Sequence, residues 1–285
     1  MYETLTFEIS DHIAHVVFNR PRLRNAMNVT SWRELGEVFN RISETPEARV
    51  AVLSSTGPHF SAGIDLKSLG SLLDASGEVD EGRRREALMR IILELQDTVS
   101  ALEKCRVPVL VAVQGGCIGG GVDIISASDM RYCTEDAYFV IKETEIGMTA
   151  DLGTLQRLPH LIPAGAMREL AFTGRDMAAN EAREIGLVNQ VYVDHESMLA
   201  GVMEIARQIA AHSPLAQRGV KEMLNYARDH SVADGLNYIA VWNAAMIEGS
   251  EMMEAMAARR GKRAATFNDL LERIDIDPKP KAAAE

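Results

Sequence analysis

The chain has 285 residues, 47% of them hydrophobic, and a formal net charge of −11 at pH 7, which suits one large core with or without a helical appendage. Its acidity, without a long lysine or arginine block, argues against partners such as nucleic acid or an anionic membrane surface. Because no apolar run approaches the ~20 residues of a membrane span and no basic or Ser-rich leader precedes the first strand, we expect a cytoplasmic protein.

The N-terminal part of the chain is expected to begin with a hairpin. Leu5 to Asn19 alternates or runs apolar with one polar break, which favours two strands with Ile13 to Phe18 as the second. A proline then ends the strand, and Arg22 and Arg24 concentrate positive charge ahead of a helix predicted from about Thr30 to Ser43. This basic cluster is either a solvated loop or the local patch that an anionic ligand would need.

The next strand leads into an unusually apolar loop. Val50 to Leu53 reads as a short buried strand, and the loop SSTGPHFSAGIDL follows it at residues 54–66. Exposed connections seldom keep phenylalanine, isoleucine and leucine together, so we expect this loop to fold over a pocket. His59 lies in the loop without a partner motif, which favours a packing or hydrogen-bonding role over catalysis.

A patternless segment precedes the next helix. Gly70 to Arg85 is polar and glycine-containing, and we interpret it as a mobile surface segment or a short insertion. From Leu88 to Leu102 apolar residues recur at three- and four-residue steps, which predicts a helix. Val109 to Val113 then reads as a strand buried on both faces, and the order strand, helix, strand implies a right-handed parallel crossover.

A glycine cluster follows that strand within VLVAVQGGCIGGGVDIISAS, residues 109–128. The chain turns through the glycines and enters a helix that carries Asp123, so free N–H groups at the helix start can hold an anion or a developing oxyanion. The turn is neither a GxGxxG fingerprint nor a GxxxxGK[ST] phosphate loop. Alternatively, the glycines only permit close packing and Asp123 complements the helix dipole.

Three carboxylates gather downstream of two short strand candidates, Met130 to Cys133 and Tyr138 to Ile141. In KETEIGMTADLGTLQRLP, which starts at residue 142, Glu143, Glu145 and Asp151 lie near glycines, and Asp151 opens what reads as a helix entrance. A solvated acidic loop is the simplest interpretation. The interleaved apolar residues favour partial burial, and buried carboxylates need a reason.

The rest of the chain is predicted to be mainly helical. We expect helices at Pro163–Phe172, Ala178–Ile185, Met198–Ala211, Leu215–Tyr226 and Leu236–Ala258, the last kinked near Gly249, and a strand at Leu187–Val193. Four methionines at helical steps in the last helix favour helix packing or a subunit interface. Asp277 to Glu285 is expected to be a disordered tail.

The cysteines indicate neither disulfides nor zinc. Cys105, Cys117 and Cys133 form no CxxC pair, are odd in number and have apolar neighbours, so we expect buried, reduced thiols. No His/Cys cluster has the spacing of metal ligands, so we expect no metal and no redox cofactor.

Taken together, HFSAGIDL, GGCIGGGVD and KETEIG resemble the crotonase (enoyl-CoA hydratase/isomerase) superfamily over roughly residues 5–260. Within it, CIGGGVD, RYCTEDA and ADLGTLQRLP are most similar to the Δ3,5-Δ2,4-dienoyl-CoA isomerases. The resemblance implies an α/β fold, a crotonase-like ββα spiral with two roughly perpendicular sheets and a C-terminal helical region. It also implies homotrimers, commonly paired into homohexamers as dimers of trimers. We therefore expect a core at residues 1–195, a helical trimerisation region at 196–270 and a disordered tail at 271–285.

The resemblance also assigns residues to an acyl-CoA thioester substrate, with coenzyme A as part of the substrate and no separate cofactor. The backbone N–H groups of Ile64 and Gly120 would form an oxyanion hole for the thioester carbonyl. Further positions would bind coenzyme A, with two arginines near its phosphates and three residues near its adenine. These are Arg22, Arg24, Ala62, Asp65 and Leu66.

The acid–base groups distinguish the reactions of the superfamily. Hydratases use two glutamates, and here the first position is Asp123 and the second is Glu143, while Asp151 matches the further carboxylate of the dienoyl isomerases. We assign Glu143 to carbon 2 and Asp151 to carbon 6, with Asp123 hydrogen-bonding and tuning Glu143. The reverse order of Glu143 and Asp151 stays open. Gln114 replaces the histidine that often precedes the glycine pair in the superfamily.

The expected reaction is the conversion of a 3,5-dienoyl-CoA to a 2,4-dienoyl-CoA in fatty-acid beta-oxidation. The alternative enzyme is an enoyl-CoA hydratase or another acyl-CoA isomerase of the superfamily. The alternative outside catalysis is a relative that binds CoA thioesters or RNA, and the acidic charge argues against RNA.

Overall fold

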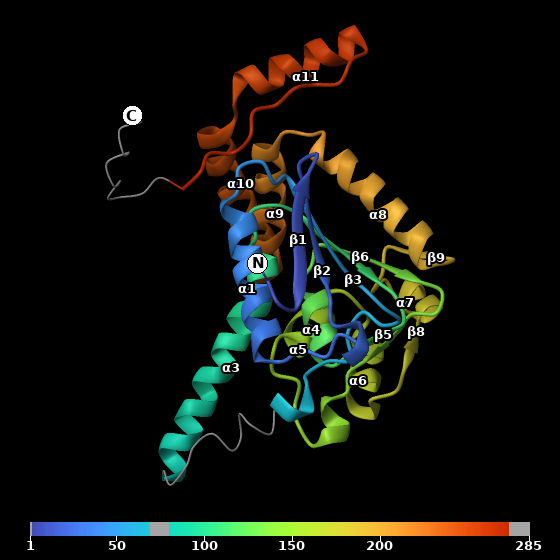
Figure 1. Cartoon of the computed structure of the whole chain (residues 1–285). Coiled ribbons are helices and arrows are strands. Elements are labelled where there is room, and N and C mark those ends of the chain that lie inside the picture. The colour runs from blue at the N-terminus through green and yellow to red at the C-terminus, as the bar shows by residue number, and fades with distance from the viewer. Residues whose placement is uncertain (1, 69–79, 274–285) are drawn as a thin grey trace, which may run out of the picture.

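The structure is a computed structural model that describes residues 2–68 and 80–273. Two β-sheets form its centre, and helices surround them (Figure 1). The strands are β1 (Leu5–Ser10), β2 (Ile13–Phe18), β3 (Val50–Ser55), β4 (Val109–Val113), β5 (Gly116–Ile118), β6 (Met130–Thr134), β7 (Tyr138–Val140), β8 (Met177–Ala178) and β9 (Gln190–Tyr192). The helices are α1 (Val29–Glu44), α3 (Glu81–Lys104), α4 (Gly120–Ser126), α5 (Thr154–Arg157), α6 (Ala164–Thr173), α7 (Ala179–Glu184), α8 (His195–Ala210), α9 (Pro214–Asp229), α10 (Val232–Met246) and α11 (Gly249–Gly261), with short 3-10 turns η1 (Pro21–Leu23), η2 (Glu143–Ile146) and η3 (Leu158–His160).

The larger sheet has the strand order β1-β2-β3-β4-β6-β9. β1 and β2 form the predicted antiparallel hairpin, and the remaining neighbours pair in parallel. The long helix α3 connects the parallel neighbours β3 and β4, as the crossover prediction requires.

The middle strands of the larger sheet, β3 and β4, are buried on both faces because a helical layer covers each face. Along β4, Val111 packs into the main core with Leu35 and Phe39 of α1, whereas the next residue along, Ala112, packs with Val202 of α8. This alternation of side chains explains why β4 reads as an unbroken apolar run.

The smaller sheet, β5-β7-β8, lies beside the glycine turn. The apolar loop that follows β3 runs parallel to β5 and joins it through a bridge between Ser61 and Cys117. The loop and the turn are far apart in sequence, and this bridge makes them neighbours.

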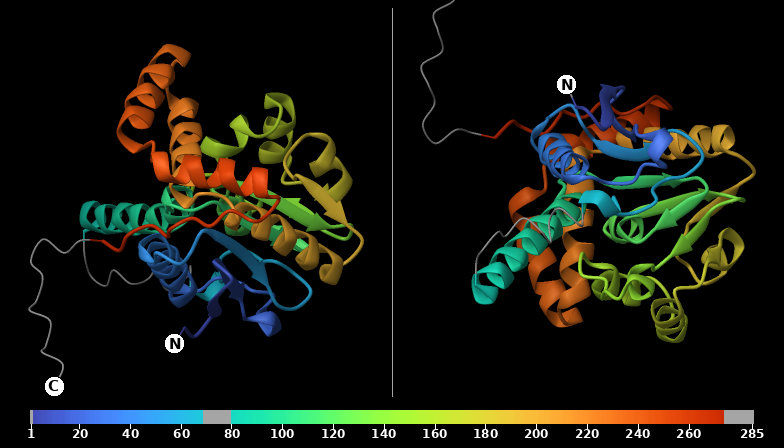
Figure 2. Two further views of the ribbon diagram at one scale, coloured as in Figure 1. Left: turned by 90° about the horizontal axis from the view of Figure 1, so that it is seen from above. Right: turned by 60° about the horizontal axis from the view of Figure 1, so that its bottom comes forward.

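Two helix boundaries differ from the sequence-based predictions. The helix predicted at residues 236–258 is two helices, because the Glu248 side chain accepts a hydrogen bond from Ser250 N (3.1 Å) and caps the start of α11. Figures 1 and 2 show α11 turned away from α10, beyond the sheets. In the segment 70–85, residues 81–85 belong to α3, because Asp80 caps that helix through Arg83 N (3.1 Å), while residues 69–79 lie outside the described residues.

Smaller differences concern strand length and the C-terminus. The last strand spans Gln190–Tyr192 instead of Leu187–Val193, because Leu187 and Val188 turn into the core. The helix α8, which begins at the expected domain boundary, packs on the larger sheet, and the division at residue 195 stays a prediction. The predicted tail at 277–285 falls outside the described residues.

In the described part of the chain, no helix combines the length and the apolar character needed to cross a bilayer. Cys105, Cys117 and Cys133 are buried free thiols, as predicted.

Candidate active site

The register between the apolar loop and β5 brings the two predicted oxyanion donors together. Ser61 N donates to Gly116 O (3.1 Å), and Ile118 N donates to Ser61 O (3.0 Å). Because the segments run parallel from this bridge, Ile64 and Gly120 come to the same level. A Cβ atom built on Gly63, next to Ile64, would lie 3.6 Å from Gly120 N, so the two backbones approach closely.

Both of these amides are free to donate. Met27 pairs with the backbone on either side of Ile64, since Met27 N donates to Gly63 O (2.8 Å) and Asp65 N donates to Met27 O (2.9 Å). The N–H of Ile64 therefore points away from Met27. Gly120 is the first residue of α4, where an N–H has no acceptor within the helix. Neither amide has a hydrogen-bond acceptor among residues 2–68 and 80–273.

Close contacts fix two of the glycines in the turn. Gly119 has φ 51°, and a Cβ atom there would lie 3.1 Å from Glu143 Oε1. A Cβ atom on Gly120 would lie 2.9 Å from the ring of Trp32. Sequence reasoning missed Trp32, because an apolar residue on an amphipathic helix is first read as core.

Asp123 is held inside α4 and is 1% exposed. Its Oδ1 accepts hydrogen bonds from both N and Oγ1 of Thr154, each at 2.7 Å. Burial raises the pKa of Asp123 to about 6, although the Thr154 bonds favour its ionised form. Sequence reasoning did not single out Thr154, which lies in the ADLGT stretch that carries the resemblance.

Glu143 begins η2 and faces the glycine turn. Burial raises its pKa to about 7, and the negative charge of Asp123 adds to this effect. Glu143 Oε2 is buried and has no hydrogen-bond partner in the described part of the molecule. The expected hydrogen bond between Asp123 and Glu143 is not found, since Asp123 bonds Thr154 and acts on Glu143 through its charge.

Asp151 belongs to the same group through its charge interactions. Burial raises the pKa of its half-buried carboxyl, and its charge in turn opposes ionisation of Asp123 and Glu143. Its carbonyl oxygen accepts a hydrogen bond from Gln96 of α3 (2.7 Å). Asp151 also lines a polar cavity of about 390 Å³ between α3, α5 and α9. The residue that precedes α5 is Gly153, without a side-chain cap, so Asp151 does not cap that helix.

The residues predicted to bind coenzyme A lie in or near the apolar loop at residues 54–66. Arg22 and Arg24 are exposed in and just after η1, and Ala62 N donates to Arg24 O (2.9 Å), which joins the basic turn to the oxyanion loop. Asp65 lies 3.6 Å from a guanidinium nitrogen of Arg20. The adjacent Leu66 is 66% exposed, which leaves its side chain open to a ligand.

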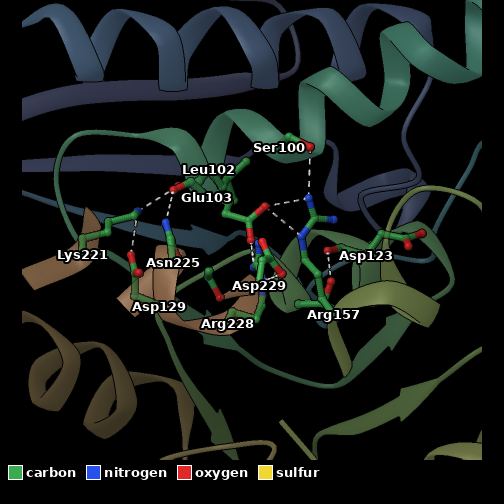
Figure 3. A network of polar contacts seen from close by, with 12 residues as sticks. Ser100, Leu102, Glu103, Asp123, Asp129, Arg157, Lys221, Asn225, Arg228 and Asp229 are labelled. Atoms are coloured by element: carbon green, nitrogen blue, oxygen red, sulfur yellow. Dashed lines mark hydrogen bonds and ion pairs between the residues drawn. The ribbon is translucent and has the colours of Figure 1, made fainter. Parts of the chain in front are cut away.

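A paired polar network holds α5 in place (Figure 3). Glu103 of α3 accepts hydrogen bonds from Arg157 of α5 through Nε (3.2 Å) and Nη2 (3.0 Å), and from Arg228 of α9. Ser100 Oγ accepts a further bond from Arg157 (3.0 Å). Burial alone would raise the pKa of Glu103, but the two guanidinium groups lower it below its ordinary value.

A second part of the network joins α9 to the strand that precedes the glycine turn. The buried Lys221 donates to Leu102 O (3.0 Å), Val107 O (3.1 Å) and Asp129 Oδ2 (2.8 Å). Asp129 Oδ2 also accepts a hydrogen bond from Val109 N (2.7 Å). Helix α9 is thus linked to β4 through Asp129 and to α5 through Glu103 of α3 (Figure 3).

No group of three or more His, Cys, Asp or Glu side chains within residues 2–68 and 80–273 is placed to hold a metal ion. The negative charges of Asp123 and Asp151 raise the pKa of Glu143, and that of Asp151 also raises the pKa of Asp123, which suits the exchange of protons.

Three comparisons place this geometry among known proteins. The family model for enoyl-CoA hydratase/isomerase matches residues 8–270. The mitochondrial Delta(3,5)-Delta(2,4)-dienoyl-CoA isomerase of Pongo abelii is 45% identical over 275 residues, which are 94% of this chain and 84% of that protein. The peroxisomal isomerase of the same name from Arabidopsis thaliana is 42% identical over 259 residues, 90% of this chain and 93% of that protein. The structure of an enoyl-CoA hydratase from Bacillus anthracis superposes with a TM-score of 0.83 at 28% identity, covering 93% of this chain and 99% of that one.

The comparisons confirm the predicted fold class and overturn the predicted location. The structural likeness extends over nearly the whole of both chains. The prediction of a cytoplasmic protein is wrong, because the similar proteins of Pongo abelii and Arabidopsis thaliana are named mitochondrial and peroxisomal.

Proposed function

The chain belongs to the enoyl-CoA hydratase/isomerase family, and we propose that it is a dienoyl-CoA isomerase of fatty-acid beta-oxidation that converts 3,5-dienoyl-CoA to 2,4-dienoyl-CoA. One observation carries the proposal. Three carboxyl groups, Asp123, Glu143 and Asp151, interact near the glycine turn and have raised pKa values, and Glu143 Oε2 is buried without a hydrogen-bond partner in the described part of the chain. A carboxyl group that ionises near neutral pH serves equally as base and acid.

The thioester carbonyl binds between the N–H groups of Ile64 and Gly120. The two N–H groups lie at the same level because of the pairing register, and neither has another acceptor among residues 2–68 and 80–273, which supports this role. As the proton leaves carbon 2, negative charge moves onto the thioester oxygen, where two fixed donors stabilise it. Removing one such donor typically costs about 3–4 kcal/mol of transition-state stabilisation.

Glu143 takes the proton from carbon 2, which leaves a dienolate conjugated from the carbonyl to carbon 6. Asp151, protonated at the start, delivers its proton to carbon 6, so the double bonds end at carbons 2 and 4. Glu143 then releases its proton and Asp151 takes one up, so no net proton is consumed. Burial raises the pKa of Glu143 to about 7, and the negative charge of Asp123 adds to this effect. The side chain of Asp151 has access to the polar cavity beside α5, which supports its place at the far end of the diene.

The coenzyme A part binds at the loop that leads to Ile64. Arg22 and Arg24 bind its phosphates, and Ala62, Asp65 and Leu66 line the adenine side. The exposure of the arginines and the bond between Ala62 and Arg24 support this assignment. The reaction needs only proton transfer, so we expect no metal and no cofactor apart from the substrate's own coenzyme A.

The active form is a homotrimer or a homohexamer. Helices α9, α10 and α11 line an apolar groove of about 780 Å³, and Leu224 and Leu236 in it are 69% and 64% exposed. So large an exposed apolar surface marks an interface. Light scattering at micromolar concentration should give a multiple of the 31.3 kDa chain mass, and a monomer would remove this part of the proposal.

The activity is tested by giving the protein 3,5-dienoyl-CoA and 2-enoyl-CoA in separate reactions. We expect the absorbance of the conjugated 2,4-dienoyl thioester to rise in the first and little water addition in the second. Hydration of 2-enoyl-CoA without formation of the conjugated diene would replace the isomerase with the hydratase.

A further inference from the structure

We propose that Thr154 is a positioning residue for the proton transfer, which holds the Asp123 carboxylate in place beside Glu143 through two hydrogen bonds. The inference rests on the proposed isomerase activity and assigns a role to a residue outside the three carboxylates.

Both bonds end on one oxygen of Asp123. Thr154 N and Oγ1 each lie 2.7 Å from Oδ1, and Oδ2 accepts no hydrogen bond from residues 2–68 or 80–273. Asp123 is 1% exposed and Thr154 is equally buried, so water does not replace these donors. The two donors of Thr154 therefore hold the carboxylate in one fixed orientation.

The position of Thr154 is built into the start of α5. The preceding Gly153 has φ 127°, which a residue with a side chain rarely adopts, and it turns the chain so that Thr154 begins the helix. At this position the N–H has no acceptor within the helix, and Asp123 satisfies it. A helix of one turn is not stable alone, so α5 depends on tertiary contacts.

Those contacts come from the network centred on Glu103. Arg157 ends α5 one turn after Thr154, and its guanidinium binds Glu103 and Ser100 of α3. Arg157 also donates to Leu152 O (3.3 Å) and packs over Gly153. Both ends of α5 are thus fastened, one to Glu103 and the other to Asp123.

Several charged or titratable groups act on Asp123 from the elements around it. Glu143 lies on η2 and Asp151 lies before α5, the Cys117 thiol lies on β5, and Arg157 is the positive group. Among the residues that the structure describes, Thr154 alone donates hydrogen bonds to the Asp123 carboxylate. Without the Thr154 hydroxyl the ionised carboxylate loses one donor, so the pKa of Asp123 rises above about 6. A neutral Asp123 no longer opposes ionisation of Glu143, whose pKa then falls below about 7.

The test compares Thr154→Val, which removes the hydroxyl and keeps the shape and the backbone N–H, with Thr154→Ser, which keeps both donors. In Thr154→Val we expect kcat for 3,5-dienoyl-CoA to fall about tenfold, the scale of one hydrogen bond to a charged group, with KM little changed. The acid limb of the pH–kcat profile should move to lower pH by roughly half a unit or more, because Glu143 ionises earlier. Thr154→Ser should keep the wild-type rate and profile.

Each outcome separates the two proposals. A wild-type protein that does not isomerise 3,5-dienoyl-CoA overturns the proposed function itself. An active wild type with an unchanged rate and acid limb in folded Thr154→Val overturns the role of Thr154. If both Thr154→Val and Thr154→Ser have a lower kcat and neither moves the acid limb of the pH–kcat profile, the role of Thr154 is purely structural. That result also overturns the proposed positioning role. If near-ultraviolet circular dichroism shows that Thr154→Val does not fold, Thr154→Ala removes the same donor with less bulk.

Discussion

The two polar regions beside α5 treat the same chemical group in opposite ways. Around the glycine turn, Glu143 is buried near other carboxylates, and its pKa rises to about 7. A few residues away across α5, Glu103 is also largely buried, but it is bonded to Arg157 and Arg228, and its pKa falls. Burial favours the neutral form in both regions, and the presence of arginine partners decides the outcome. One region is suited to exchanging protons and the other to holding helices together.

The largest expected effect comes from removing the proton carrier of the first region. Glu143→Gln should lower isomerisation by roughly 10³-fold or more, because an amide cannot take up the proton from carbon 2. The matched control is Glu145→Gln, an exposed carboxylate that pairs with Lys142 on the same turn, and it should leave the rate near wild type. Steady-state kinetics with 3,5-dienoyl-CoA measures both, and equal losses would contradict the assignment of Glu143.

The glycine turn is tested at Gly120. Gly120→Pro deletes the proposed oxyanion donor and should lower kcat by roughly 10²–10³-fold. Gly120→Ala is the control, since its Cβ atom makes the same close contact with Trp32 but keeps the N–H. In variants shown to be folded, the ratio of the two kcat values measures the contribution of the Gly120 N–H. If alanine costs as much as proline, crowding and not the missing N–H explains the loss.

Asp151→Asn tests proton delivery to carbon 6 separately from proton removal at carbon 2. The amide keeps the shape of the side chain and loses its titrating proton, so isomerisation should fall by roughly 10²-fold. Any hydration of 2-enoyl-CoA should fall much less, because no proton has to reach carbon 6. Diene formation near the wild-type rate in this variant, together with hydration that stops in Glu143→Gln, would favour the hydratase.

In the second region the expected effect is on stability. Glu103→Gln should lower the free energy of unfolding by about 2 kcal/mol at pH 7, because the Arg157 guanidinium loses its charged partner and Arg228 loses one of its two. A carboxylate with a lowered pKa stabilises the fold above its unfolded pKa, so the difference from wild type should shrink as pH falls below about 4.5. Urea unfolding at several pH values measures this. Glu204→Gln, at the exposed pair with Arg207, is the control and should change stability by less than about 0.5 kcal/mol.

A further effect on stability, of opposite sign, is expected at Glu143. Its raised pKa means that the folded protein resists ionisation, so stability falls as pH rises from about 4.5 through about 7. Glu143→Gln removes this cost and should stabilise the protein above pH 7 by up to about 3 kcal/mol, because each pKa unit corresponds to about 1.4 kcal/mol, with no gain near pH 4. Urea unfolding of the two proteins at pH 4 and pH 8 checks the sign. A variant less stable than wild type at pH 8 would mean that Glu143 is not destabilised by burial.

Much of the fold follows from apolar patterns in the sequence, because the strands of the larger sheet are short apolar runs and α1 and α3 carry clear helical periods. The strands β5 and β8 were not predicted, since three- and two-residue strands show no period and depend on their partners. The break between α10 and α11 was placed near Gly249, and the structure shows that the cap at Glu248 causes it.

The parts of the candidate site that lie in short, recognisable sequence segments could be predicted from the sequence. The glycine turn, Asp123, Glu143 and Asp151 lie in recognisable segments. Thr154 and Trp32 were missed because their importance comes from contacts with residues distant in the chain, Asp123 and Gly120. A threonine or a tryptophan at one position in the sequence does not indicate which distant residue it will contact.

The bridge between Ser61 and Cys117 also bears on how the protein folds. The oxyanion donors come together only when the chain has closed the long loop between them, and the entropy of that closure must be overcome before the contact stabilises anything. Helices such as α1 and α3 need no such closure and can form early. Recovery of catalytic activity during refolding should therefore lag behind recovery of helical structure, and activity reports the completed topology of the chain.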